Sequence, residues 1–403
     1  MKFQNLFGKK ALFIGLICLL LCGLLLFSGC SKLALFMLDQ VVDDTTAEND
    51  TASNARNNLE TGSVHRENPE DILIRSGSQT SEGDPSSAET LAIADVVRLV
   101  QDSVVEIYTA YGSSGSGSAG SGVIISETGY VLTCNHVVED ASSVVVMLKN
   151  GKQYNAQLVG TDAATDLAVI KINPAETDKL VAVIHGISGN LVAGETVVAI
   201  GNPLGTLGGT VTHGIISATE RKVSFTGNDG SKTEMTLLQT DAAINSGNSG
   251  GGLFNLRGEL IGIVNAKYAS TGVEGLGFAI PIDSAYTVEC DLIEYGYVRG
   301  VVDHGLTLLD ITASNRYYYY RYGISDTGLY VVSSKYNSDL VNKDRILSVN
   351  GITVNTTDEL NAIVKELSIG DILNIRYIHN GETRETTIRL REYVPDNVSI
   401  DFS

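Results

Sequence analysis

"GNSGGGLFNLRGELIGIV", from Gly247 to Val264, sets one serine, Ser249, among glycines and follows it with two apolar runs joined by a turn. Small residues often form a flexible turn. A nucleophilic serine needs them for another reason, because the attacked carbonyl must approach closely while backbone N–H groups point at its oxygen. The G-x-S-x-G nucleophile of α/β-hydrolases has a helix after the serine. Here a β-hairpin pattern follows, which indicates a β protein instead.

A serine nucleophile needs a base, and the order of the candidates along the chain is informative. His136 ends the strand-like run of "GYVLTCNHVVEDA", and Asp166 opens the apolar strand "DLAVIKI". A carboxylate there is costly to bury without a partner, and an imidazole N–H is a suitable one. In α/β-hydrolases the acid and the histidine follow the serine. Only His304 and His379 follow Ser249, both in what is predicted to be another domain.

Residues 91–297 have the pattern of an all-β domain. Short β runs alternate with Gly, Asn and Asp turns without intervening helices, which is typical of a barrel or sandwich. The segment "IDSAYTVECDLIEYGYV" is predicted to be a helix that closes this domain.

Residues 298–395 change pattern and predict a small α+β domain. Five β runs ("GLTLLDI", "GLYVVSS", "RILSVNG", "DILNIRYI", "ETTIRL") surround one amphipathic helix, "TTDELNAIVKELSIG". That helix opens with a Thr cap and has apolar residues on one face.

The first residues have the pattern of a membrane anchor. Lys9 and Lys10 precede an uncharged apolar run, Ala11 to Cys30, which as a helix of about 30 Å would span the hydrocarbon core of a bilayer. We therefore expect a cytoplasmic stub and a transmembrane helix in residues 1–38, with the rest of the chain exported. The alternative is a lipoprotein, because "LLLFSGC" is similar to a bacterial lipobox with Cys30 as the lipidated residue.

Two further stretches are of low complexity. Residues 39–90 are rich in Asp, Glu, Asn, Ser and Thr, so they cannot bury enough apolar surface to offset their ordering entropy. They are predicted to form a disordered acidic linker. "SSGSGSAGSG" (113–122) lies between two strand-like runs and is predicted to be a surface loop.

Composition excludes some partners. The formal net charge is −19, so the chain is a poor candidate for binding nucleic acid, whose phosphates need Lys and Arg. His185 and His213 have no ligand partners at metal spacing. Three of the five cysteines lie in the predicted anchor, and Cys134 and Cys290 are expected to be free thiols.

Several segments together resemble the HtrA (Deg) family of trypsin-like serine proteases. They are "GSGVIISETGYVLTCNHVV", "TDLAVIKI", "AIGNPLG", "TVTHGIISATER", "LQTDAAINSGNSGGGLFN" and "GLGFAIP", in the family's order. The resemblance implies a mainly β fold: a chymotrypsin-like pair of six-stranded β-barrels with the active site between them. It implies no metal or organic cofactor.

The resemblance also assigns catalytic roles. It implies Ser249 as the nucleophile, His136 as the general base and Asp166 as the acid that orients the imidazole. The oxyanion hole falls on Gly247, Asn248 and Ser249, with the N–H groups of the first and last as donors.

The substrate pocket is predicted to be apolar. Ala243 stands where related enzymes that cut after basic residues carry an acid, and Ile244 with Asn265, Ala266 and Lys267 would form the walls. Small or medium aliphatic side chains should precede the cut. Lys267 either narrows this pocket or faces solvent.

The C-terminal domain resembles the PDZ domain that follows the protease in this family. "HGLTLLD" (His304 to Asp310) matches the loop and strand that receive a peptide's C-terminal carboxylate. Gly305, Leu306 and Thr307 would then offer backbone N–H groups while the peptide adds a strand to the sheet. "RYYYYRY" (316–322) is unusual and is expected to be an aromatic loop packed on the domain, with partner contact as the alternative.

These features predict a membrane-tethered, extracytoplasmic serine endopeptidase for misfolded or unfolded exported proteins, assembled as a homotrimer as is common in the family. The main alternative is a catalytically silent, anchored peptide-binding scaffold or holdase. An adhesion or structural surface protein would explain the anchor and the acidic linker but not the triad.

Overall fold

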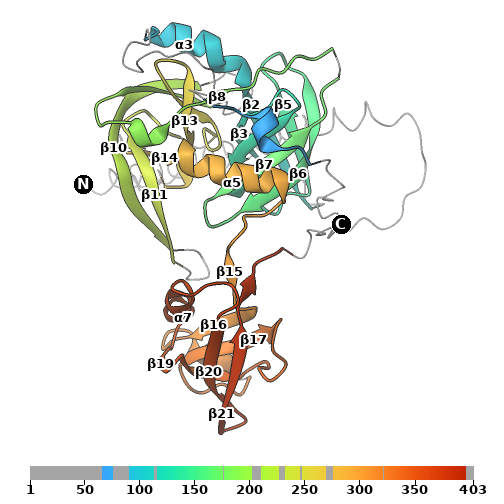
Figure 1. The fold of residues 1–403 in the computed structure, drawn as a ribbon, viewed down its shortest axis with the longest axis vertical. Coiled ribbons are helices and arrows are strands. Elements are labelled where there is room, and N and C mark those ends of the chain that lie inside the picture. Colours follow the sequence, from blue (N-terminus) through green and yellow to red (C-terminus); the bar gives the residue numbers. More distant parts are fainter. Residues whose placement is uncertain are drawn as a thin grey trace, which may run out of the picture. The chain divides into compact units, whose positions relative to one another are not determined.

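The structure is a computed structural model that describes residues 66–75, 90–112, 116–175, 177–201, 210–226, 232–245, 247–268, 276–320 and 322–395. These residues fall into two units (Figure 1): the described parts of Met1–Val223 and Met235–Gly296, and those of Ser224–Glu234 and Tyr297–Ser403. The predicted anchor, residues 1–38, lies outside the described residues. Among the described residues, no helix is long and apolar enough to cross a membrane.

A closed barrel forms the first half of the larger unit. Its strands follow the order β2-β3-β4-β7-β6-β5. They are β2 (Val104–Tyr111), β3 (Ser116–Ile124), β4 (Tyr130–Cys134), β5 (Ser143–Met147), β6 (Gln153–Asp162) and β7 (Leu167–Ile172). All of β4 is buried, with β3 and β7 on its two sides and α4 in contact with it.

A second ring of six strands follows. The order is β13-β12-β9-β10-β11-β14, and pairing of β13 with β14 closes the ring. The strands are β9 (Thr196–Gly201), β10 (Thr210–Thr226), β11 (Lys232–Thr240), β12 (Gly252–Asn255), β13 (Glu259–Val264) and β14 (Gly277–Pro281). β12 and β13 pair antiparallel, so the hairpin predicted after Ser249 is confirmed, as is the pair of six-stranded barrels.

Helices join and cover the barrels. α5 (Ile282–Glu294) contacts β6 and β7 of the first barrel and β13 and β14 of the second, as its position in Figure 1 illustrates. This confirms the predicted closing helix. α3 (Ile93–Val100) is amphipathic, with Val96 and Val100 buried. The short helices are α4 (Asn135–Val138), η2 (Gln101–Ser103), η4 (Ser188–Asn190) and η5 (Ala266–Tyr268).

The prediction of a surface loop at 113–122 is wrong for residues 116–122, which belong to β3 and pair with β2. Packing explains the glycines there. A Cβ on Gly120 would lie 2.6 Å from Val137 Cγ1, and one on Gly122 would lie 2.7 Å from Val131 Cγ1. Both distances are far below van der Waals contact, so these glycines mark close approach within a strand.

Residues 66–75, inside the segment predicted to be a disordered linker, are ordered against the protease unit. They form α2 (Pro69–Ile72), capped by Asn68, and β1 (Ile74–Arg75), which pairs parallel with β8 (Ile184–His185). We call residues 66–75 the strap. An Arg75–Asp283 ion pair of 2.7 Å binds the strap to α5.

The smaller unit is a sheet with the order β16-β17-β18-β20-β21. Its elements are β15 (Val302–Asp303), β16 (Leu306–Ile311), α6 (Arg316–Tyr320), β17 (Gly328–Ser334), β18 (Arg345–Val349), β19 (Ile352–Thr353), α7 (Thr357–Val364), β20 (Ile372–His379), β21 (Glu382–Arg389) and β22 (Arg391–Glu392). β16 is an edge strand, and α7 lies against it. The five predicted strands and the helix are confirmed, including the Thr356 cap, which accepts from the N–H of Glu359.

The tyrosine-rich segment is not a packed loop. Residues 316–320 form α6, and Tyr317, Tyr318 and Tyr320 are 85%, 65% and 72% exposed. Tyr319 alone packs on a small cluster with Ile311 and Ile324. A five-residue helix can turn only one side toward the domain, so the other rings face outward.

Candidate active site

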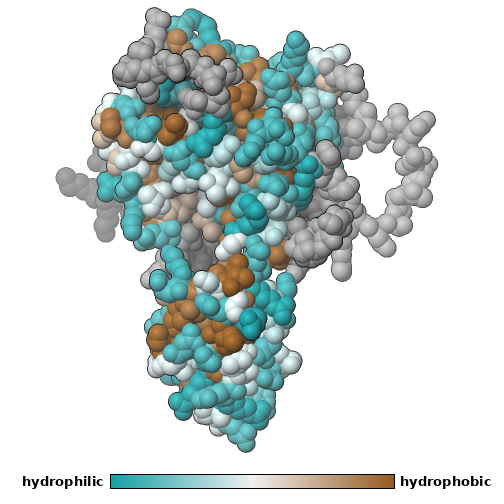
Figure 2. All heavy atoms as spheres, in the orientation of Figure 1, coloured by the Kyte–Doolittle hydropathy of each residue, from teal (hydrophilic) through white to brown (hydrophobic). Residues whose placement is uncertain are grey.

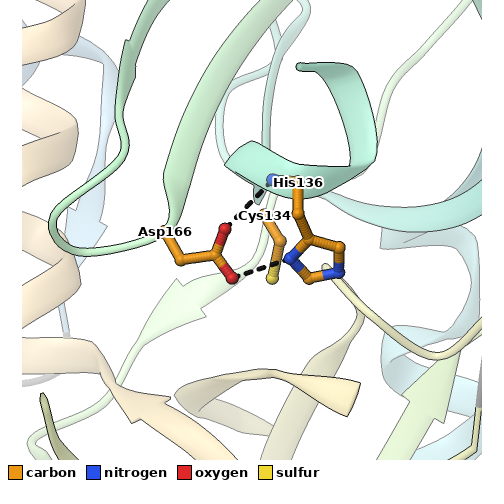
Figure 3. A group of neighbouring side chains, drawn as sticks. All are labelled: Cys134, His136 and Asp166. Carbon is orange, nitrogen blue, oxygen red and sulfur yellow. Dashed lines mark hydrogen bonds and ion pairs between the residues drawn. The ribbon is translucent and has the colours of Figure 1, made fainter. Parts of the chain in front are cut away.

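The short helix α4 directs His136 toward Asp166 (Figure 3). The N–H at Nδ1 of His136 donates to Asp166 Oδ2 over 2.7 Å, and the backbone N–H of His136 donates to Asp166 Oδ1 over 3.0 Å. The two bonds fix both the tautomer and the plane of the imidazole. Nε2 is therefore the nitrogen left to take up a proton.

Asp166 is held in an uncommon backbone conformation in the turn between β6 and β7. Its φ is 55°, in the left-handed region that Asp tolerates better than most residues. Its carbonyl also accepts from Asn135 N–H over 2.9 Å. The side chain of Asp166 is 3% exposed, and such strain held by surrounding bonds is typical of a functional site.

Asn265, which follows β13 in the other barrel, completes the environment of Asp166. It is fully buried, and its Nδ2 donates to Asp166 Oδ2 over 2.8 Å. Burial alone raises the pKa of the Asp166 carboxyl, but the hydrogen bonds and charge of His136, with the bond from Asn265, hold that pKa below its usual value. Asp166 is therefore a buried carboxylate with two donors to one oxygen.

The loop between β11 and β12 carries Ser249 and is hydrogen-bonded to Ser121 of the first barrel. Ser121 N–H donates to Ser249 O over 2.9 Å, and Ser121 Oγ donates to Gly247 O over 2.6 Å. A Cβ on Gly250 would lie 2.2 Å from Ser121 O, at a φ of +83°. Only glycine fits there, so the glycine after the serine is required by both space and conformation.

The hydroxyl of Ser249 does not bond to His136 in this structure. Its Oγ accepts from the N–H of Ala266 over 3.1 Å, and no hydrogen bond joins it to His136 Nε2, although both residues are described. Catalytic hydrogen bonds in unliganded enzymes are often long and tighten when substrate binds.

The backbone N–H groups predicted to form the oxyanion hole differ in whether they already have a hydrogen-bond acceptor. The N–H of Asn248 donates to Asn245 O over 3.0 Å within the loop. Among the described residues the N–H groups of Gly247 and Ser249 have no acceptor. Gly247 has a φ of +100°, so its backbone adopts a conformation closed to most other residues.

A thiol lies beside the imidazole and carboxylate. The potential ligand atoms of Cys134, His136 and Asp166 lie within 4.8 Å of one another. However, Nδ1 of His136 already donates to Asp166, and the thiol donates to Val264 O over 3.4 Å. Burial, reinforced by the Asp166 charge, raises the pKa of the Cys134 thiol well above its usual value, whereas a metal would need the thiolate. Cys134, His136 and Asp166 are thus engaged in hydrogen bonds within the protein, and these three side chains fit a hydrogen-bonded site better than a metal centre.

The predicted pocket residues divide into two groups. Ala243 is exposed, Ile244 and Ala266 are partly buried, and Lys267 is exposed. Asn265 points instead at Asp166, and its Oδ1 accepts from Lys267 N–H over 3.1 Å. The sequence therefore missed the role of Asn265 in holding the acid, and its only signal was a polar residue directly after the apolar run Leu260–Val264.

In the smaller unit, the predicted carboxylate loop lies at the start of the edge strand β16. Gly305 precedes the strand, Leu306 opens it, and Thr307 pairs with Ser333 of β17. α7 lies beside this strand. An edge strand flanked by a helix is the arrangement to which an extended peptide can add.

Comparison with known proteins agrees with these two units. Residues 120–263 match the family model of the trypsin-like peptidase domain, and residues 316–390 match that of the PDZ domain. The chain is 36% identical to "Serine protease Do-like HtrA" of Bacillus subtilis (strain 168), over 75% of this chain and 74% of that protein. It is 37% identical to "Probable periplasmic serine endoprotease DegP-like" of Halomonas elongata, over 70% of this chain and 57% of that protein. A solved structure, "HtrA-type protease AlgW with tripeptide", is 34% identical, with 76% of this chain and 99% of that chain covered and a TM-score of 0.48.

The domains and the site together define a serine endopeptidase of the trypsin-like class with a PDZ domain. The Bacillus subtilis relative named HtrA is 36% identical, with about three quarters of each chain covered. The chain belongs to the HtrA family of serine proteases, and the resemblance found in its sequence is confirmed.

Proposed function

We propose that the protein cleaves unfolded or misfolded exported polypeptides through an acyl-enzyme formed on Ser249. The observation that carries this proposal is the buried Asp166, which holds His136 by two hydrogen bonds of 2.7 and 3.0 Å with Ser249 in the facing loop. A buried carboxylate in this position stabilises the imidazolium that forms when the base takes a proton.

The reaction then follows from the chemistry of these groups. His136 Nε2 takes the proton of Ser249 Oγ as the oxygen attacks a peptide carbonyl, and the resulting oxyanion is bound by the N–H groups of Gly247 and Ser249. The imidazolium gives its proton to the leaving amine, which departs and leaves an acyl-enzyme. Water, activated by the same imidazole, releases the new carboxylate and restores the serine.

The substrate and location rest on further features. An exposed Ala243 and a partly buried Ile244 support a pocket for small or medium aliphatic side chains, which unfolded chains expose. The apolar run from Ala11 to Cys30 supports attachment to a membrane, as a helix or through a lipid on Cys30, with the catalytic unit on the extracytoplasmic side. The name of the Halomonas relative, which is called periplasmic, also supports export. We further propose a homotrimer, and a PDZ unit that binds peptide C-termini through the loop at Gly305.

The test compares the full-length protein with its Ser249→Ala variant on unfolded β-casein, with cut sites read by mass spectrometry. Ser142→Ala is the matched control, because its hydroxyl donates only to Ala110 O on the first barrel. We expect cuts after aliphatic residues in the parent and the control and none in Ser249→Ala. Intact casein with the parent, together with no labelling of Ser249 by a fluorophosphonate, would favour the silent scaffold.

A further inference from the structure

The start of β16 offers backbone N–H groups on the open edge of the smaller unit's sheet. Lys335 N–H donates to Gly305 O over 2.7 Å, and Leu306 pairs with Ser334. Alternate residues of an antiparallel strand direct their N–H groups to opposite sides, so the N–H of Leu306 points away from β17. Figure 2 shows hydrophobic side chains at the surface near β16 and α7. Leu306 and Leu308 of β16, Ile363 of α7 and Leu367 just beyond α7 are partly buried.

The protein's own side chains already occupy the two N–H groups that a peptide carboxylate would need. Gly305 N–H donates to Asp303 Oδ1 over 2.7 Å, and Leu306 N–H donates to His304 Nδ1 over 3.0 Å. Asp303 thus lies where an incoming carboxylate would bind. His304 is held in turn by Asn361 of α7, with Nε2 3.3 Å from its Oδ1.

A second set of contacts fixes Asp303 in this position. Tyr336 O–H donates to Asp303 Oδ2 over 2.6 Å, and Arg391 lies 4.5 Å from the centre of the Tyr336 ring. Gly305 has a φ of +67°, and a Cβ there would lie 2.4 Å from Tyr336. The loop is therefore built around this contact, and alanine at Gly305 would not fit.

The hydrogen bonds identify the protonation state of His304. Nδ1 accepts a hydrogen bond from a backbone N–H, so it carries no proton itself, and Nε2 carries the ring proton and donates a hydrogen bond to Asn361 Oδ1. His304 is thus a neutral imidazole in this structure. An imidazolium has two N–H donors and no acceptor, so it could not keep the bond from Leu306.

We propose that Asp303 and His304 close the carboxylate-binding loop of the PDZ unit, and that protonation of His304 opens it to the C-terminal carboxylate of a peptide. The proposal rests on the proposed peptide-binding function. Protonation frees Leu306 N–H for the ligand and places a cationic donor beside the ligand's carboxylate, which offsets repulsion from Asp303. Binding of an anion and of a proton at adjacent groups then reinforce each other.

The groups around His304 act on its pKa in opposite directions. Burial lowers the pKa of His304, while the bond to Asn361 and the charge of Asp303 act in the other direction. Other groups near the loop, by strand pairing and helical spacing, are Lys335, Tyr336, Arg391, Glu392, Asp358 and Lys365. The loop should therefore be closed near neutral pH and open progressively in mildly acidic solution.

Linkage sets the size of the effect. If only the protonated form bound, a histidine with the ordinary pKa would raise affinity about tenfold between pH 7.5 and 5.5. The lowered pKa of His304 reduces the protonated fraction more at pH 7.5 than at pH 5.5, so we expect a rise of more than about tenfold, with about a hundredfold as the limit set by two pH units. Peptide carboxylates stay ionised throughout this range.

The test uses the full-length protein with Ser249→Ala, so that probes are not cut. The probe is a pool of decapeptides randomised in the last four residues, with the C-terminally amidated pool as the control. The fraction retained with the protein is measured by mass spectrometry at pH 7.5 and 5.5. His304→Leu removes the acceptor for Leu306 N–H, and His304→Asn keeps an uncharged acceptor. His379→Asn, in the same unit but bound to Asp344, is the matched control.

We expect retention of free-acid peptides to rise at pH 5.5 in the parent and in His379→Asn. In His304→Leu, retention should be independent of pH and above the parent's value at pH 7.5, because Leu306 N–H is free but no cation is present. In His304→Asn it should be low at both pH values. If peptide retention changed with pH equally in the His304 variants and in the parent, control of the loop by His304 would be contradicted, whereas peptide binding itself would stand. No retention by any variant at either pH would contradict the peptide-binding function itself.

Discussion

A buried ion pair beneath the strap leads to a prediction that can be worked out in detail. His185 and Glu289 are both fully buried, with Nε2 of His185 3.1 Å from Glu289 Oε2 and Nδ1 3.2 Å from Ile74 O. A backbone carbonyl can only accept, and an ionised carboxylate can only accept. With the Glu289 carboxyl ionised, both ring nitrogens carry protons and His185 is a buried imidazolium.

The perturbation is Glu289→Gln, which keeps the shape and removes the charge. Removing one partner of a buried pair typically costs about 3–5 kcal/mol. The side-chain oxygen of Gln can still accept a hydrogen bond from His185 Nε2. Glu289 Oε1 has no hydrogen-bond partner among the described residues, so replacing that oxygen by an amide nitrogen breaks no further hydrogen bond. We therefore expect a smaller loss in the free energy of unfolding, about 1–3 kcal/mol near pH 6.

The loss should depend on pH. Burial lowers the pKa of His185, but the charge of Glu289 and the hydrogen bonds outweigh it and raise that pKa above 6.5. A raised pKa stabilises the folded state fully below the unfolded pKa, and this contribution is lost as the pH rises through the folded pKa. Glu289→Gln removes the contribution, so parent and variant should differ most near pH 6 and least in alkaline solution.

The assay is urea unfolding read by hydrogen exchange of peptides from α5 and β8, at pH 6 and pH 9. Reading these peptides separates the protease unit from the smaller unit. Glu294→Gln, exposed at the end of the same helix, is the matched control and should leave the midpoint unchanged. The reasoning is refuted if Glu289→Gln shifts the midpoint equally at both pH values, or no more than the control does.

Two further predictions concern the catalytic environment and the first barrel. Asn265→Ala removes a 2.8 Å hydrogen bond to the Asp166 carboxylate. A hydrogen bond to a charged group contributes about 1.5–3 kcal/mol, so kcat/KM on a peptide substrate should fall about tenfold to a hundredfold. An unchanged kcat/KM and pH–rate profile would exclude a positioning role for Asn265. Gly122→Ala would place a Cβ 2.7 Å from Val131 Cγ1, so the protease unit should lose about 1–3 kcal/mol in urea unfolding; a parental midpoint would show that β3 moves freely enough to admit a methyl group.

Local pattern determined much of the fold. The alternation in the β runs, the cap at Thr356 and the hairpin after Ser249 depend on residues within a few positions of one another, so the sequence predicted them. The order His136, Asp166, Ser249 excluded the α/β-hydrolase fold for a different reason, because the order of residues along a chain can be read without coordinates.

Other features depend on residues far apart in the chain, and only the tertiary structure decided them. The glycines of β3 resemble a flexible loop until Val131 and Val137 lie against them. The strap has too few apolar residues to order alone, and is ordered because α5 and β8 offer partners. Likewise, Asn265 bonds to Asp166, and His304 lies against Asn361 of α7. Side-chain chemistry fixes what a residue can bind, whereas its partner is fixed only when the folded chain brings one within hydrogen-bonding distance.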